Sequence, residues 1–327
     1  MWFPRGRLRY QVTSTRDLST RAICANSVDS LPEGFRPITP ADTPHLSALF
    51  DQAQKQAWCY YTPFLNCYHL PPGRQVLLGT VRDATCILSR TDRKQTIYNL
   101  VVPPAPFDVD ALAEVCDLLR DATAVDPRVL WCDAEDAERA QSGGFQVEEK
   151  EREYIYDPAR VAAMVGPEYK ALRKRVGQAE RRYAPEMTEL QEGRLEECHD
   201  LLARWRRLQG RKHAFLLDWG YTKSALNRFD EWGVEDLGGW TASVGGQLAA
   251  FGMAGPITPD LACFFMLKSD PELLGLSEWL RYQIFRKLSE RFQRVNDAGD
   301  LDLPGLRQHK RMFRPVDLRP VYSLHRS

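Results

Sequence analysis

The 327-residue sequence lacks a Cys-x-x-Cys pair, a clustered His/Cys motif and any long apolar run. Its eight cysteines are scattered, so we expect neither a structural zinc site nor a secreted disulfide framework, and we assign no metal. The longest fully apolar run, LACFFML at residues 261–267, is far shorter than the roughly 20 residues that cross a bilayer. The sequence therefore predicts a protein of a reducing cytoplasm, with no transmembrane segment.

The first 34 residues also lack the apolar centre of a secretory signal peptide, although they carry arginines and several Ser and Thr residues. We expect residues 1–34 to be a poorly ordered leader, and an organelle transit peptide is the alternative. Neither interpretation assigns a folded structure to this segment.

Net charge is absent too, because 44 basic residues balance 44 acidic ones. The distribution is uneven: residues 108–157 hold fifteen acids and five bases, a local charge of 5 − 15 = −10. Cations gather elsewhere, and such clusters either bind a polyanion or form solvated helix faces. The clusters are Lys170, Arg173, Lys174, Arg175, Arg181 and Arg182; Arg204, Arg206, Arg207, Arg211 and Lys212; and Arg307, Lys310, Arg311 and Arg314. As nucleic-acid-binding residues we select Lys170, Arg173, Lys174, Arg175, Arg311 and Arg314.

The predicted secondary-structure elements repeat one order twice. Each half presents a helix, a hairpin, a central strand, a helix, a strand, a short helix and a final strand. The adjacent glycines 245 and 246 suit a tight hairpin turn between GWTASV and QLAAFGMA. Expected helices are 108–122, 134–141, 193–209, 222–232, 276–292 and 303–313. This order predicts an α+β fold of two tandem GNAT-like acyltransferase domains, with mixed central sheets flanked by helices.

The predicted domains follow from that repeat. They are an N-terminal GNAT-like domain at 35–157, a linker helix and strand at 158–192, and a C-terminal catalytic GNAT-like domain at 193–327. The acidic N-terminal half is expected to serve mainly as a scaffold.

Four segments resemble one known family, the C-terminal domains of the phosphatidylglycerol lysyltransferases, over about residues 35–324. They are REYIYDPARVAAMVG with KALRKRVGQAER; the helix of Trp205; GWTASVGGQLAAFGM; and the closing series Asn296, Asp300, Gly305-Leu306-Arg307, Lys310 and Pro315. The sequence departs from the family pattern in three respects, which put the lipid acceptor in doubt more than the fold. Ala298 stands where the family typically has Glu, Asp302 stands where it often has Gly, and we expect no counterpart of the family's membrane domain.

The resemblance implies transfer of an aminoacyl group from aminoacyl-tRNA to an amine or hydroxyl acceptor, such as a lipid head group, a peptide or a small molecule. A cytoplasmic enzyme of this kind could also lie peripherally at a membrane surface. Two alternatives stay open: an acyl-CoA-dependent N-acyltransferase, which fits the fold alone, and a non-catalytic RNA-binding protein. No cofactor is expected beyond the donor substrate.

The closing series supplies the candidate catalytic residues Asn296, Asp300, Arg307 and Lys310. An aminoacyl ester is already activated, so the enzyme must position the reactants, accept a proton and stabilise an oxyanion. Asp300 is either the orienting, proton-accepting carboxylate or the partner of Arg307 or Lys310 in an ion pair. Lys310 is expected on an exposed cationic helix face, where it either contacts the oxyanion or a phosphate or forms a plain surface salt bridge. Asp302 is expected to cap that helix.

Two further segments leave alternatives open. Gly275 and Ser277 follow the central strand, where a GNAT protein binds the donor's pyrophosphate at a helix N-terminus, so they are donor-contact candidates or an ordinary helix start. The acids Asp270 and Glu272 nearby disfavour coenzyme A. The aromatic stretch WCYYTPFLNCYHL at 58–70 either belongs to the core or lines a substrate cleft.

Overall fold

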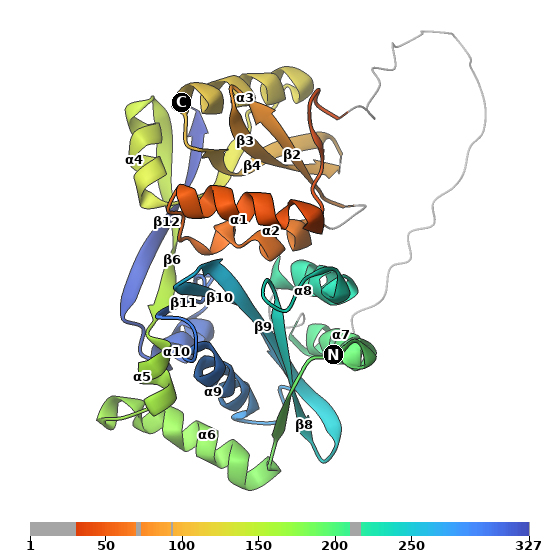
Figure 1. Ribbon diagram of the computed structural model, residues 1–327, viewed down its shortest axis with the longest axis vertical. Coiled ribbons are helices and arrows are strands. Elements are labelled where there is room, and N and C mark those ends of the chain that lie inside the picture. The colour runs from red at the N-terminus through yellow and green to blue at the C-terminus, as the bar shows by residue number, and fades with distance from the viewer. Residues whose placement is uncertain (1–30, 70–72, 93, 210–216, 327) are drawn as a thin grey trace, which may run out of the picture. The chain divides into compact units, whose positions relative to one another are not determined.

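The computed structural model describes residues 31–69, 73–92, 94–209 and 217–326 (Figure 1). Most of the predicted leader therefore lies outside the described residues, and so do Arg211 and Lys212. Residues from Pro32 onward form one compact unit. No helix of the described residues is long and apolar enough to cross a membrane.

One mixed sheet of twelve strands runs through the described part of the chain. Its strand order is β1-β2-β3-β4-β5-β12-β6-β11-β10-β9-β8-β7. The strands are β1 (Arg36–Pro37), β2 (Gln75–Val81), β3 (Ala84–Asp92), β4 (Thr96–Ala105), β5 (Arg128–Cys132), β6 (Phe145–Tyr156), β7 (Glu186–Glu189), β8 (Gly238–Val244), β9 (Gln247–Thr258), β10 (Leu261–Ser269), β11 (Arg294–Asn296) and β12 (Asp317–Arg326).

The strand order contains the predicted repeat. In each half, antiparallel strands lead to one parallel pair, β4 with β5 and β10 with β11. Beyond each parallel pair, the next strand comes from the other half of the chain. β12 lies between β5 and β6, and β6 lies between β12 and β11. The two halves thus exchange their last strands, and Figure 1 shows β6 and β12 side by side. The predicted domain boundaries stay a prediction.

Ten α-helices in the described residues flank the sheet (Figure 1). They are α1 (Thr43–Gln52), α2 (Thr62–Tyr68), α3 (Val109–Thr123), α4 (Ala134–Ser142), α5 (Pro158–Ala163), α6 (Lys170–Tyr183), α7 (Leu195–Gln209), α8 (Leu217–Asn227), α9 (Leu276–Leu288) and α10 (Pro304–Met312). Helices α5 and α6 pack against α9 in one core, while α2, α7 and α8 belong to the other.

Local sequence explains several of these elements. Glycines 245 and 246 have φ angles of 58° and 79°, which confirms the tight turn between β8 and β9. Asp108 accepts hydrogen bonds from the backbone N–H groups of Asp110 and Ala111 and so caps α3.

Three predicted helix details were wrong. The helix expected at 222–232 is α8, which begins five residues earlier, and the helix expected at 276–292 ends at Leu288. Asp302 does not cap α10, because the capping position is Leu303 and makes no side-chain bond. The Asp302 carboxylate instead accepts a hydrogen bond from Arg307.

Candidate functional site

Seven aromatic side chains line a cavity of about 280 Å³, which we call the aromatic cavity. They are Trp58, Phe64, Tyr68, Trp131, Tyr221, Phe264 and Phe265. The rings pack on one another, with centroids 4.4 Å apart for Trp58 and Phe64 and 5.5 Å apart for Tyr221 and Phe265. Trp58 and Phe64 of the aromatic stretch are buried in the core, as one alternative expected, and they also line this cavity, whose use by a substrate stays a prediction.

Charged side chains line the same cavity. They are Lys150, Glu151 and Glu153 of β6, Lys268 of β10, Arg281 of α9, Asp297 after β11, and Lys310 of α10. Strand β6 contributes from the centre of the sheet, where it pairs with both β12 and β11. The strand exchange thus brings residues of both halves of the chain to one cavity.

Lys310 is buried, with 4% of its surface exposed, so the expectation of an exposed position was wrong. Its Nζ donates hydrogen bonds to the backbone carbonyls of Asp297 and Ala298, the second at 3.2 Å. The Asp297 carboxylate lies 3.5 Å from Nζ and also pairs with Arg281. Burial lowers the pKa of Lys310, and Asp297 partly opposes that shift. Lys310 is thus a fixed hydrogen-bond donor at the cavity wall.

Glu153 is buried beside the aromatic cavity. Its carboxylate accepts hydrogen bonds from the backbone N–H of Trp58 at 2.9 Å and from Asn296 Nδ2 at 2.6 Å. Burial raises the pKa of Glu153 to about 7, although these two hydrogen bonds act against the shift. Asn296 also donates to the Gln56 carbonyl at 3.1 Å, so its amide holds Glu153 in place.

Glu151 differs from Glu153 in having an oxygen without a partner. Its Oε2 is buried and makes no hydrogen bond to any residue that the structure describes. Burial raises the pKa of Glu151, while Lys150 and Lys310 lower it by a smaller amount. A carboxylate with a raised pKa and an open acceptor position is suited to taking a proton from a substrate.

Glu151 also lines a second space of about 430 Å³, which we call the polar cleft. The other lining residues are Glu149, Lys150, Arg152, Tyr154, Asp300, Asp302, Arg307, Arg311 and Leu318. Because Lys150 and Glu151 belong to both linings, the polar cleft and the aromatic cavity adjoin at these two side chains.

The ion pair considered for Asp300 is present. Asp300 accepts hydrogen bonds from Tyr154 Oη at 2.6 Å and from Arg307 Nε at 2.7 Å. Burial alone would raise the pKa of Asp300, but the bonds from Arg307 and Tyr154 lower it overall. Asp300 is thus a weak proton acceptor, and Glu151 suits that role better.

Gly275 and Ser277 lie at the start of α9, as expected. Gly275 has a φ angle of 91°, and a β-carbon there would lie 2.8 Å from the backbone oxygen of Arg175 in α6. The glycine therefore permits close packing of α6 on the start of α9. Contact of Gly275 or Ser277 with a donor stays a prediction.

The cations expected to bind nucleic acid occupy different settings. Lys170, Arg173, Lys174 and Arg175 are all exposed on α6, and Arg173 also donates hydrogen bonds to the backbone carbonyls of Met164 and Gly166. Arg311 lines the polar cleft. Arg314 lies beyond the end of α10, and its Nε donates to the Glu168 carbonyl at 2.8 Å.

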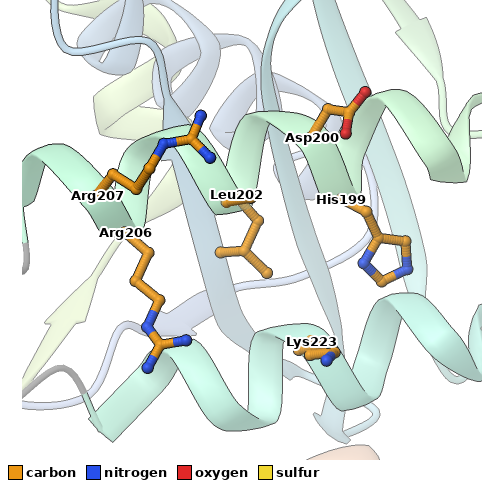
Figure 2. A pocket seen from close by; sticks show the side chains of 7 residues that line it. His199, Asp200, Leu202, Arg206, Arg207 and Lys223 are labelled. Carbon is orange, nitrogen blue, oxygen red and sulfur yellow. The ribbon is translucent and has the colours of Figure 1, made fainter.

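A third space, of about 580 Å³, lies between α7 and α8, and we call it the basic hollow (Figure 2). Its lining residues are His199, Asp200, Leu202, Ala203, Arg206, Arg207 and Lys223. Figure 2 shows Arg206 projecting from α7 toward α8, the helix that carries Lys223. Burial and the charge of Lys223 both lower the pKa of His199. Cations on two helices thus line one space.

One group of side chains has the spacing of a metal site. Cys132, Asp133 and Asp136 place ligand atoms within 4.8 Å of one another. The buried Nζ of Lys55 lies 3.0 Å from Asp133 and 2.6 Å from Asp136. The ammonium group thus supplies the positive charge that these carboxylates require.

Sequence reasoning missed Glu151, Glu153, Asp297, Arg281 and Trp131. A signal for the glutamates was present, since VEEKEREYIY reads as a strand in which residues two apart share a face. No local pattern could identify Trp131, because it joins the cavity through the meeting of two distant segments of chain.

Comparison with known proteins identifies the family of the chain. The family model for the C-terminal domain of phosphatidylglycerol lysyltransferase matches residues 52–325. A search of curated protein sequences gives no match to the chain.

Three solved structures share the fold. A conserved protein of unknown function from Bacteroides thetaiotaomicron is 20% identical, with a TM-score of 0.72 over 90% of this chain and 99% of that chain. The C-terminal domain of a putative lysylphosphatidylglycerol synthetase from Agrobacterium fabrum is 12% identical, with a TM-score of 0.62 over 88% and 93%. A tandem GNAT protein from the clavulanic acid biosynthesis pathway is 12% identical, with a TM-score of 0.50 over 89% and 98%. The predicted tandem GNAT-like fold is thereby confirmed.

Proposed function

The chain belongs to the family of phosphatidylglycerol lysyltransferase C-terminal domains, and on that premise we propose that it transfers an aminoacyl group from aminoacyl-tRNA to an amine or hydroxyl acceptor. The observation that carries this proposal is the junction of the aromatic cavity and the polar cleft. There a half-buried carboxylate with an open oxygen, Glu151, shares one cavity lining with a buried amine donor, Lys310.

The reaction needs few groups because the ester of aminoacyl-tRNA is already activated. Glu151 accepts the proton of the acceptor amine or hydroxyl as that atom attacks the ester carbonyl carbon. Lys310 donates a hydrogen bond to the carbonyl oxygen as it gains negative charge. This attack forms the new C–N or C–O bond, and collapse of the tetrahedral intermediate then breaks the ester C–O bond. The proton on Glu151 then passes to the ribose oxygen that leaves with the tRNA.

Asn296, Asp300 and Arg307 take positioning roles in this mechanism. Asn296 holds Glu153 against the backbone of Trp58. Arg307 and Tyr154 hold Asp300 at the wall of the polar cleft. None of the three is required to exchange a proton with the substrate.

In this proposal, cations on several elements supply contacts to the donor's phosphates. Arg311 of the polar cleft contacts the end of the tRNA, and Lys170 and Lys174, which are exposed on α6, add further contacts. Arg206 and Lys223 of the basic hollow extend the proposed contacts to α7 and α8. RNA binding through such contacts weakens as salt rises, because each neutralised phosphate releases bound counterions.

An acyl-CoA-dependent N-acyltransferase is the second candidate, because it fits the fold alone, and the tandem GNAT protein is described as solved without AcCoA. The packing of α6 on Gly275 disfavours it, since that backbone covers part of the start of α9, where a GNAT protein binds pyrophosphate. A non-catalytic RNA-binding protein would not require an open carboxylate oxygen beside a buried amine.

The test is incubation of the protein with a pool of radiolabelled aminoacyl-tRNAs and a cell extract as the source of acceptors. We expect label to move into a lipid, peptide or small-molecule fraction, and Glu151→Gln to slow that transfer by about 10² to 10⁴-fold. Label that stays on the tRNA while acetyl-CoA is consumed would support the acyl-CoA alternative. RNA binding without either transfer would support the non-catalytic one.

A further inference from the structure

Resting on the proposed function, we infer that the aromatic cavity receives the side chain of the aminoacyl group and selects an uncharged apolar or aromatic one. The inference concerns the specificity for the donor. It predicts that this protein prefers an aminoacyl group other than the lysyl group in its family's name.

The walls of the cavity favour an apolar guest. Trp131 makes edge contacts with Phe64 and Tyr68, both at centroid distances of 5.4 Å, and Trp58 lies 5.8 Å from Phe265. Packed aromatic walls gain free energy from an apolar or aromatic side chain by removing its surface from water. A volume of about 280 Å³ also fits a side chain better than a whole lipid head group with its glycerol.

The charges of the lining disfavour a cationic guest. Four basic residues line the cavity, Lys150, Lys268, Arg281 and Lys310, against three acidic ones, Glu151, Glu153 and Asp297. Two of these acids are already engaged by the protein. Glu153 accepts bonds from Trp58 and Asn296, and Asp297 pairs with Arg281. Asp297 engages Arg281 and Lys310 in turn, so the lining keeps a formal charge of 4 − 3 = +1, which an entering lysyl ammonium would increase while losing its hydration.

Protein cations also occupy aromatic faces that could attract a cationic ligand. Lys150 Nζ lies 4.0 Å from the ring centroid of Trp131, and the Arg74 guanidinium lies 3.9 Å from that of Tyr68. A ring face that already carries a cation has little attraction left for a second one. The cation–π contacts within the protein thus also disfavour a cationic side chain in the cavity.

The position required of the reacting ester carbonyl places the aminoacyl donor, and not the acceptor, in the aromatic cavity. The ester must lie within reach of both Glu151 and Lys310, and its ribose and phosphates extend into the polar cleft, where Arg307 and Arg311 stand. The side chain of the aminoacyl group then points away from the cleft, toward the aromatic rings. The acceptor approaches Glu151 from the cleft side.

The test uses amide-linked aminoacyl-adenosine analogues, which carry the aminoacyl group but cannot transfer it. We expect the phenylalanyl analogue to bind about tenfold or more tightly than the lysyl analogue, as pocket complementarity commonly allows. Lys150→Glu places a new acid beside Trp131 and should improve binding of the lysyl analogue relative to the phenylalanyl one. The matched control is Lys287→Glu, an exposed position on α9 that should leave the ratio unchanged.

The outcomes separate this inference from the proposed function. Equal or tighter binding of the lysyl analogue by the unaltered protein would overturn the specificity while leaving the aminoacyltransferase proposal intact. Failure of every analogue and of intact aminoacyl-tRNA to bind would overturn both. If Trp131→Ala leaves the ratio between donors unchanged and raises only the KM for the acceptor, the cavity holds the acceptor and the inference is wrong.

Discussion

The Glu151 carboxylate occupies the space beside the α-carbon of Gly299, where any larger residue would place a side chain. A β-carbon at Gly299 would lie 1.7 Å from Glu151 Oε2. Gly299→Ala should therefore turn this carboxylate out of its position and lower kcat about as much as Glu151→Gln does. If Glu151 accepts the substrate's proton, we expect a loss of about 10² to 10⁴-fold in each variant.

The control for Gly299→Ala is Gly305→Ala in α10, because no atom lies within 4 Å of a β-carbon at that glycine. Thermal melting should show that all three variants fold, since the end of a flexible side chain can move aside. Full turnover by both Gly299→Ala and Glu151→Gln would remove Glu151 from the mechanism.

Lys310→Met should lower turnover by about 10² to 10³-fold, the range found when one oxyanion donor is lost. Its effect on folding should differ from that of an exposed lysine. Lys310 is buried and bonded to the backbone carbonyls of Asp297 and Ala298, so the variant should also melt at a lower temperature. Single-turnover rates at saturating donor measure the first effect, and calorimetry the second.

The matched control is Lys287→Met, which removes an exposed cation from α9. It should leave both measurements unchanged. A folded Lys310→Met protein with the single-turnover rate of the unaltered protein would show that Lys310 only supports structure.

More of the fold than of the candidate site could be predicted from the sequence. The hairpin at Gly245 and Gly246 and the helix at 108–122 depend on neighbours in sequence, and both were confirmed within a residue or two. The exchange of β6 and β12 was not predicted, because strand pairing across the whole chain leaves no local periodicity. That exchange is what places Glu151 and Glu153 at the cavity.

Helix α10 also shows that contacts with distant segments cannot be predicted from a local sequence pattern. Its cationic pattern predicted an exposed face for Lys310, because charged residues are seldom buried. The structure buries it, since two backbone carbonyls and the Asp297 carboxylate replace water around Nζ. Those partners precede the helix in a turn whose geometry could not be inferred from residue types.

Glu153 gives the protein a pH-dependent stability. Folding raises the pKa of this buried carboxyl from 4.5 to about 7, so the folded state holds the proton more tightly than the unfolded state does. Its contribution is therefore most favourable below about pH 4.5 and is lost as the pH rises through 7. Glu153→Gln should remove this loss, which corresponds to about 3 kcal/mol at pH 8.

Urea unfolding at several pH values between 5 and 8.5 measures the effect. We expect the free energy of unfolding of Glu153→Gln to increase relative to that of the unaltered protein as the pH rises. Glu149→Gln, at an exposed position of the same strand, should show no such trend. A constant difference between Glu153→Gln and the unaltered protein would mean that Glu153 is ionised throughout this range.

The salt dependence of tRNA affinity tests the proposed phosphate contacts. Replacing Lys170 and Lys174 together with Gln should reduce the slope of log K against log salt by about one to two, since each contact contributes about 0.7 to 0.9. The pair Arg206 and Lys223 in the basic hollow should behave alike, and turnover at saturating donor should persist. Lys287→Gln is the control, and equal slopes for all variants would exclude both surfaces.

Gly275→Ala separates the two roles considered for the start of α9. The left-handed backbone and the 2.8 Å approach to the Arg175 oxygen leave no room for a methyl group, so α6 must shift. We expect a loss of about 1–3 kcal/mol in the free energy of unfolding, while the KM for aminoacyl-tRNA changes little below the melting range. Ser277→Ala keeps the packing and removes only a hydroxyl, so it reports donor contact alone. A large rise in the donor's KM in Ser277→Ala, at unchanged stability, would place the donor at this helix start and favour the acyl-CoA alternative.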